Sequence, residues 1–140
     1  MFYAVIDTNV LVSALLNINS KPGLVLMSVL DGTTIPLLTS EITAEYQNVL
    51  TREKFHFPAD LVKTVLSRII VCGLFVNPLP GEYLEVTDSY DRDFYAATMS
   101  GRITADALLV TGNTRHFPHE TFVVTPAQFV EMIQASKTRV

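Results

Sequence analysis

The sequence predicts an α/β fold in which a parallel sheet is covered by helices on both faces. Strand-like and helix-like segments alternate along the chain, which is typical of parallel strands joined by helical crossovers. The strand-like segments are unbroken apolar runs, which indicates strands buried on both sides. In such a sheet, ligands bind at the carboxyl ends of the strands, where the strand order reverses.

The first half of the chain contains two predicted strands, each followed by helices. The strands are residues 2–6 and the segment TIPLLTS. The helices are residues 10–16, the segment SKPGLVLMSVLDG with Ser20 as cap and Gly32 at its end, and the segment EITAEYQNVLTREKF with Ser40 as cap. Apolar residues recur at helical spacing in the last of these helices.

The second half continues the alternation. A helix with Pro58 near its start and Gly73 at its end precedes a short strand at residues 74–76. The segment DRDFYAATMSGR is a predicted helix, DALLVTGN a strand with a turn, and TFVV the last strand. Thr125, Pro126 and Gln128 together predict a capping box at the start of the final helix.

Composition limits the class of protein. A length of 140 residues is typical of a single domain, here residues 1–140. Hydrophobic residues make up 49% of the chain and charged residues 17%, which favours further buried apolar surface in a homo-oligomer such as a dimer. The longest apolar runs are too short to span a membrane, and no basic segment precedes the first of them, so we expect neither a membrane protein nor a signal peptide. The single Cys72 fits a reducing cytoplasm. The net charge of −4 disfavours a nucleic-acid coat protein but permits an enzyme whose acids are neutralised by metal ions.

Acidic and polar residues gather at the predicted strand ends. Asp7 closes the first strand and Asn113 follows the strand ALLVT, while Glu45, Asp91 and the neighbouring Asp88 and Asp93 lie on or before helices. Each has a simpler alternative: Asp7, Asp88 or Asp91 as a helix cap, Glu45 as a solvated residue and Asn113 as a turn residue. Carboxylates crowded at one edge need a compensating cation, and oxygen ligands suit Mg²⁺ or Mn²⁺. Such ions also coordinate phosphate oxygens, which indicates a phosphoester substrate.

Five segments, in order, resemble the motif blocks of PIN-domain proteins: VIDTNVLVSALL, LLTSEITAEYQNVLTREKF, TDSYDRDFYAAT, LLVTGNTRHFP and VVTPAQFVEMI. They are most similar to the VapC-like ribonucleases that act as toxins of bacterial and archaeal toxin–antitoxin systems. The resemblance implies a Rossmann-like three-layer α/β/α sandwich with a mainly parallel sheet of about five strands. It also implies a cytoplasmic, Mg²⁺- or Mn²⁺-dependent ribonuclease with a cognate antitoxin as partner.

Residue by residue, the resemblance places Asp7, Glu45 and Asp91 at the catalytic and metal-binding acids of the family. Asn113 stands where many members have a fourth acid, so the motif TGD reads TGN here. Thr8, Asn9, Thr111 and Asp88 fall at supporting positions. Contacts to RNA phosphates are expected from basic residues near these motifs, namely Arg52, Lys54, Arg92, Arg115 and His116.

Position 113 leaves one alternative open. Loss of the fourth acid and the negative net charge are compatible with a catalytically weak PIN-like domain that binds protein or RNA. A fold alone does not establish activity. Binding of Mn²⁺ to the folded chain would distinguish the enzyme from the binding module.

Overall fold

Five parallel strands form a single sheet in the computed structural model, which describes residues 1–138. The strand order is β3–β2–β1–β4–β5. The strands are β1 (Phe2–Ile6), β2 (Thr34–Leu38), β3 (Leu74–Phe75), β4 (Leu108–Val110) and β5 (Val123–Val124). The first strand therefore lies at the centre, and the chain leaves it first toward β2 and later returns to β4 on its other side.

Helices join these strands as the alternating pattern predicted. They are α1 (Thr8–Leu16), α2 (Lys21–Leu30), α3 (Ser40–Leu50), α4 (Ala59–Cys72), α5 (Ser89–Gly101) and α6 (Pro126–Lys137). Two short 3₁₀ turns, η1 (Glu53–Phe55) and η2 (Thr114–His116), follow α3 and β4. The expected α/β sandwich with a parallel sheet of about five strands is confirmed.

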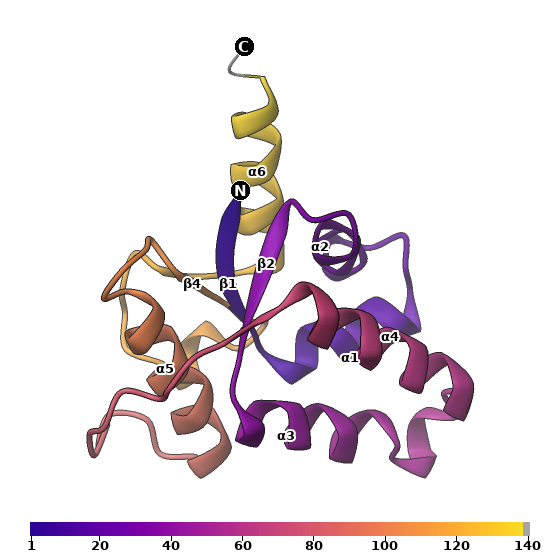
Figure 1. The fold of residues 1–140 in the computed structure, drawn as a ribbon, viewed down its shortest axis with the longest axis horizontal. Coiled ribbons are helices and arrows are strands. Elements are labelled where there is room, and N and C mark those ends of the chain that lie inside the picture. Colours follow the sequence, from indigo (N-terminus) through magenta and orange to yellow (C-terminus); the bar gives the residue numbers. More distant parts are fainter. Residues whose placement is uncertain (139–140) are drawn as a thin grey trace.

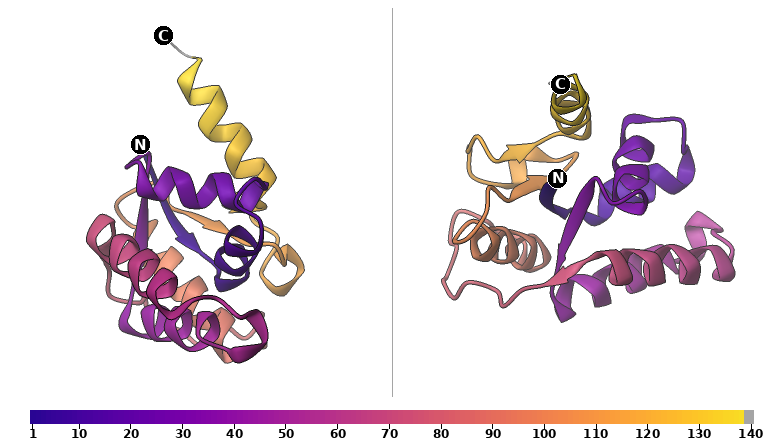
Figure 2. Two further views of the ribbon diagram at one scale, coloured as in Figure 1. Left: turned by 90° about the vertical axis from the view of Figure 1, so that its right-hand side faces the viewer. Right: turned by 45° about the horizontal axis from the view of Figure 1, so that its top comes forward.

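The helices cover the sheet in two layers. Helix α5 packs against β1, β2 and β4 on one face, whereas α2 and α4 contact β2 and α6 packs on α2. Figure 1 shows the sheet edge-on between these groups, and the right-hand view of Figure 2 places α6 and α5 on opposite sides of it. The buried core fills both interfaces and includes Ile6, Leu11, Leu37, Tyr46, Phe94, Leu109 and Phe129.

Two predicted helix starts are confirmed by their hydrogen bonds. The Ser20 hydroxyl accepts a hydrogen bond from the Gly23 amide at 3.1 Å, which satisfies an amide that the first turn of α2 leaves free. At α6, the Thr125 hydroxyl and the Gln128 side chain each accept a bond from the other residue's backbone amide. This reciprocal pair is the capping box that the sequence predicted.

The predicted limits of α3 are wrong at both ends. The N-cap is Thr39, whose hydroxyl accepts from the Ile42 amide at 3.1 Å, and Ser40 is the first helical residue. The helix ends at Leu50 instead of continuing to Phe55. Beyond it the chain turns through η1 and then through His56, whose φ of 54° lies in the left-handed region and cannot continue a right-handed helix.

No single helix within residues 1–138 has the length and apolar character needed to cross a membrane. Only α1 and α2 taken together reach that length, and they are bent by 104° at the break between them.

Candidate active site

Asp7 lies at the carboxyl end of the central strand. Its amide donates to the Val110 carbonyl at 2.9 Å, which continues the β1–β4 ladder, and its carbonyl accepts from the Val10 amide at the start of α1. Strand order reverses at this point, because β1 has β2 on one side and β4 on the other. Ligands of open parallel sheets bind at such switch points. The side chain is only 6% exposed, so a charged group is held in a largely dry place.

The Asp7 carboxylate does not cap α1, although Asp7 occupies the N-cap position. Within the described part of the chain, its side chain forms no capping hydrogen bond, even though the nearby amides of Thr8 and Asn9 lower its pKa. Its Oδ2 atom instead accepts from the Thr111 hydroxyl at 2.7 Å and from the Asn9 side-chain amide at 3.2 Å. Asp7 thus occupies the N-cap position, while its carboxylate is held by side chains from the loop after β4 and from the first turn of α1.

Thr111 and Asn9 join the loop after β4 to the first turn of α1. The Thr111 hydroxyl, which donates to Asp7, also accepts from the Asn113 amide at 3.0 Å. The Asn9 side-chain oxygen accepts from the Gly112 amide at 3.2 Å. Because each bridging side chain makes two bonds, the orientation of the Asp7 carboxylate is fixed by the packing of two strands.

Asp91 approaches from the first turn of α5. Asp88 is the N-cap of this helix, and its carboxylate accepts from the Tyr90 amide at 2.8 Å and the Asp91 amide at 3.4 Å. The capping role thus belongs to Asp88 and leaves the Asp91 side chain available. One Asp91 carboxylate oxygen lies 3.3 Å from Nδ1 of His116, a contact between α5 and η2.

Glu45 approaches from α3, which is anchored next to Asp7. The hydroxyl of Tyr46, a fully buried neighbour of Glu45, donates to the carbonyl of Ile6, the residue immediately before Asp7. This bond holds the middle of α3 against the end of β1. The Oε2 atom of Glu45 is buried and has no hydrogen-bond partner among residues 1–138. Thr8 Oγ1 is the other buried side-chain oxygen without a partner in this part of the chain.

Burial raises the pKa of all three carboxylates, and the charge of Asp7 acts on the other two. Burial raises the pKa of Asp7, and the Thr111 hydrogen bond partly opposes this effect. Burial also raises the pKa of Asp91, with a further increase from the charge of Asp7 and a decrease from His116. The pKa of Glu45 is raised by burial and by nearby acids including Asp7, and lowered by Arg52. The group therefore holds more negative charge than its neighbours balance, and a proton or a cation stabilises it.

The donor set suits a hard divalent ion in its chemistry but is not closed around one. Among the described residues, no three His, Cys, Asp or Glu side chains lie close enough to hold a metal ion together. The carboxylate oxygens are nevertheless the ligands that Mg²⁺ and Mn²⁺ prefer. The unpartnered Glu45 Oε2 is a buried acceptor that a bound ion or its water would satisfy. The chemistry of these oxygen donors fits such an ion.

The other residues selected from sequence divide into two groups. Arg92 donates to the Val86 carbonyl, so its guanidinium group is occupied by a local contact. The exposed residues Arg52, Lys54, Arg115 and His116 remain accessible on the surface.

Asn113 is exposed, and its side chain lines a separate cavity of about 260 Å³ with Asn9 and Ser13. Its contact with the site runs through the backbone, from its amide to the Thr111 hydroxyl. Sequence reasoning missed the contact of His116 with Asp91 and the anchoring bond of Tyr46. Both join elements far apart in the chain, and no local pattern signals them.

Comparison with known families agrees with this geometry. Residues 3–115 match the family described as PIN domain, a stretch that contains all three acids, Thr111 and Asn113. No curated protein and no solved structure matched the chain.

Proposed function

Because this chain belongs to the PIN-domain family, whose members are generally nucleases, we propose that it is an endoribonuclease that hydrolyses RNA phosphodiester bonds with Mg²⁺ or Mn²⁺. One observation carries the proposal. Three partly or fully buried carboxylates come from the end of β1, from α3 and from α5; burial raises the pKa of each, and the charge of Asp7 at the switch point of the sheet raises the pKa of the other two further. Such a cluster is stabilised by a divalent ion, and a phosphoester completes the coordination of that ion.

In this mechanism each side chain has a separate task. Asp7 and Asp91 hold the ion, and Thr111 and Asn9 keep the Asp7 carboxylate in one orientation through their hydrogen bonds. A bound ion lowers the pKa of a coordinated water and stabilises the negative charge that develops on the phosphate. Glu45 Oε2 accepts a hydrogen bond from the attacking water, which supplies the partner that this buried atom lacks within residues 1–138. No side chain becomes covalently attached to the RNA.

The proposal extends to a biological role as the toxin of a toxin–antitoxin pair, in the cytoplasm. It is supported by the resemblance of the five ordered motif blocks to that branch of the family. A cognate antitoxin is then the expected protein partner. The test is whether a small gene lies beside the one for this chain and whether its co-expression relieves growth inhibition caused by the chain alone; growth inhibition unaffected by that gene contradicts the pairing.

Self-association is also proposed. Leu74 and Phe75 in edge strand β3 are 50% and 54% exposed, and apolar surface of this kind is usually covered in an oligomer. Light scattering should give a mass above the 15.5 kDa monomer, and Phe75→Glu should lower it. A monomeric mass for the unmodified protein would contradict the proposal.

A binding module without strong catalysis is the second candidate. It is favoured by Asn113, which supplies an amide where many family members have a fourth acid, and by the open arrangement of the three acids among the described residues. A titration with Mn²⁺ separates the two candidates. An ion that binds the folded site raises the melting temperature, whereas a module without a metal site shows no rise.

The decisive test is RNA cleavage by the whole chain and by Asp7→Asn. The amide keeps the shape of the side chain and removes its charge, so we expect cleavage to fall by at least about two orders of magnitude. Asp106→Asn is the matched control, because it makes the same change at an exposed residue before β4, at the opposite end of the strand. EDTA should abolish cleavage, and Mg²⁺ or Mn²⁺ should restore it. Undiminished cleavage by Asp7→Asn, or in excess EDTA, would remove the proposed mechanism.

A further inference from the structure

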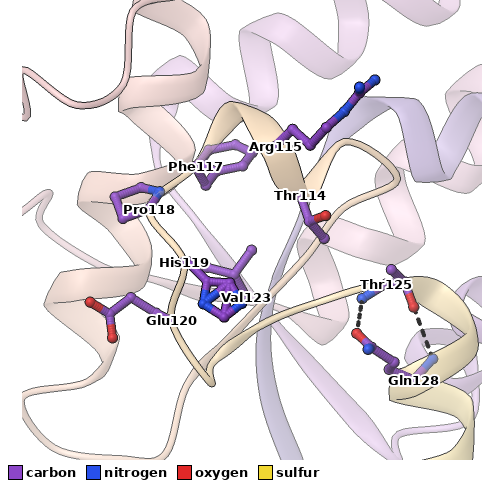
Figure 3. A pocket seen from close by; sticks show the side chains of 9 residues that line it. All are labelled: Thr114, Arg115, Phe117, Pro118, His119, Glu120, Val123, Thr125 and Gln128. Atoms are coloured by element: carbon purple, nitrogen blue, oxygen red, sulfur yellow. Dashed lines mark hydrogen bonds between the residues drawn. The ribbon is translucent and has the colours of Figure 1, made fainter.

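A cavity of about 460 Å³ lies beside the candidate active site, between the segment 114–120 and the start of α6. Figure 3 shows His119 and Val123 in the middle of this view, Phe117 and Pro118 on one side, and Thr125 and Gln128 on the other. Small-molecule pockets in proteins commonly measure about 300–1,000 Å³. The cavity is therefore large enough for a planar heterocycle.

One short element separates this cavity from the carboxylates. In η2, His116 contacts Asp91 at 3.3 Å, while Thr114 and Arg115 line the cavity. A phosphate bound to an ion beside Asp91 and a group held in the cavity would thus lie on the two sides of a single 3₁₀ turn. This arrangement suits adjoining parts of one nucleic-acid strand.

Gln128 gives the cavity a fixed hydrogen-bond donor. Its side-chain oxygen accepts from the Thr125 amide at 2.9 Å, and the Thr125 hydroxyl accepts from the Gln128 amide at 3.1 Å. This capping box determines which way the side-chain amide points, so its NH₂ group is left for a ligand. A donor that is already oriented costs less entropy when it binds than a free side chain.

The remaining lining favours a base over a phosphate. Val123 and Pro118 provide apolar surface, and His119 and Thr114 provide polar groups that can donate hydrogen bonds. Glu120 and Arg115 also line the cavity, and in Figure 3 the charged ends of both side chains point away from His119 and Val123. Uracil and guanine present carbonyl acceptors at the position where adenine and cytosine carry an amino group.

We propose that this cavity binds the base of an RNA nucleotide next to the scissile phosphate and selects uracil or guanine through the Gln128 NH₂ group. The inference rests on the proposed ribonuclease function and adds a determinant of sequence preference. It assigns to the start of α6 a role in recognition besides helix capping.

Gln128→Glu tests the donor without disturbing the helix start. Glutamate also completes a capping box, so the bond from the Thr125 amide is retained. The NH₂ donor is replaced by a carboxylate oxygen, which can only accept. Gln134→Glu is the matched control, since it makes the same change at an exposed position farther along α6.

The readout is the base preference around the cut in a pool of randomised RNA. Relative to the parent, Gln128→Glu should lower the preference for uracil and guanine over cytosine and adenine by about tenfold, as expected for one hydrogen bond. Gln134→Glu should keep the parent's profile. An unchanged profile for Gln128→Glu would overturn the proposal.

A binding measurement separates this inference from the ribonuclease proposal. Chemical shifts of the Thr114 and Val123 amides are followed while UMP, GMP, CMP, AMP or ribose 5-phosphate is added to the whole chain. UMP and GMP should shift these amides, and ribose 5-phosphate, which lacks a base, should not. If RNA is not cleaved but UMP and GMP bind in this way, the ribonuclease proposal fails and the base site stands. If RNA is cleaved but ribose 5-phosphate shifts the amides as much as UMP does, or no nucleotide shifts them, the base site fails.

Discussion

Replacing Thr111 with valine removes the shortest hydrogen bond to Asp7 and leaves the side-chain shape nearly unchanged. Thr111 is fully buried, and its hydroxyl lies 2.7 Å from Asp7 Oδ2. Hydrogen bonds to charged groups typically contribute about 1.5–3 kcal/mol to stability. In a chain of 140 residues, that loss corresponds to a fall in melting temperature of roughly 5–12 °C.

The loss of stability caused by Thr111→Val should depend on pH, and the direction of this dependence follows from the effect of the hydrogen bond on the pKa of Asp7. The Thr111 hydroxyl lowers the pKa of Asp7, so it stabilises the carboxylate more than the neutral acid. Thr111→Val should therefore destabilise the metal-free fold most near neutral pH and less below the ordinary Asp pKa of 3.8, where Asp7 is protonated in both states. The affinity for Mn²⁺ should also fall about 10–100-fold, because the ligand loses its orienting partner.

Thermal unfolding followed by circular dichroism at about pH 7.5 and pH 3.5, without metal, measures this difference. Thr98→Val is the matched control. Thr98 is equally buried, but its hydroxyl donates at 2.9 Å to the Phe94 carbonyl within α5 and not to a carboxylate. Its effect on stability should be the same at both pH values. An equal loss at both pH values for Thr111→Val would refute the assignment of Asp7 as a charge held by this bond.

Three further results are expected. Because burial raises the pKa of all three acids, the metal-free fold should lose stability as pH rises from about 4 toward neutrality. Mn²⁺ should restore more of the lost stability at neutral pH than at acidic pH. A melting temperature that rises steadily over this pH range without metal would contradict this expectation. Asn113→Asp should enlarge the rise in melting temperature that Mn²⁺ produces, since it adds a carboxylate to the loop after β4. An unchanged rise in melting temperature would show that residue 113 does not interact with the ion. Gly23→Ala should destabilise α2 strongly in a denaturant titration, because the new Cβ would lie 2.0 Å from the Ile18 carbonyl oxygen, and a silent substitution would contradict that packing.

Local signals in the sequence predicted most of the fold. The central strand at residues 2–6 was predicted with its observed limits, and the capping box of α6 followed from three residues at fixed spacing. Segments with two equivalent signals were predicted less well. Thr39 and Ser40 are adjacent hydroxyl residues and either one can cap a helix, so only the structure identifies Thr39 as the cap.

The candidate site was less predictable because it depends on contacts between distant elements. Sequence reasoning gathered Asp7, Glu45 and Asp91 at one edge from the order of strands and helices. It offered Asp88 and Asp91 alike as caps of the following helix, and the structure identifies Asp88 as the cap. The contact of His116 with Asp91 has no local signal in the sequence. The end of α3 was missed because the left-handed φ of 54° at His56 leaves no signal in the sequence pattern.

The bond from Thr111 to Asp7 joins residues 104 positions apart, which matters while the protein is being synthesised. The central strand leaves the ribosome first, but its β4 neighbour and the hydroxyl that orients the first acid emerge only after most of the chain has been translated. Until then Asp7 has no strand on its β4 side and lacks its Thr111 partner. A nascent chain that ends before β4 therefore has the acids Asp7, Glu45 and Asp91 without the frame that holds them, and the site forms only near the completion of translation. For the proposed ribonuclease, made beside messenger and ribosomal RNA, this order of assembly would delay activity until the chain is close to release.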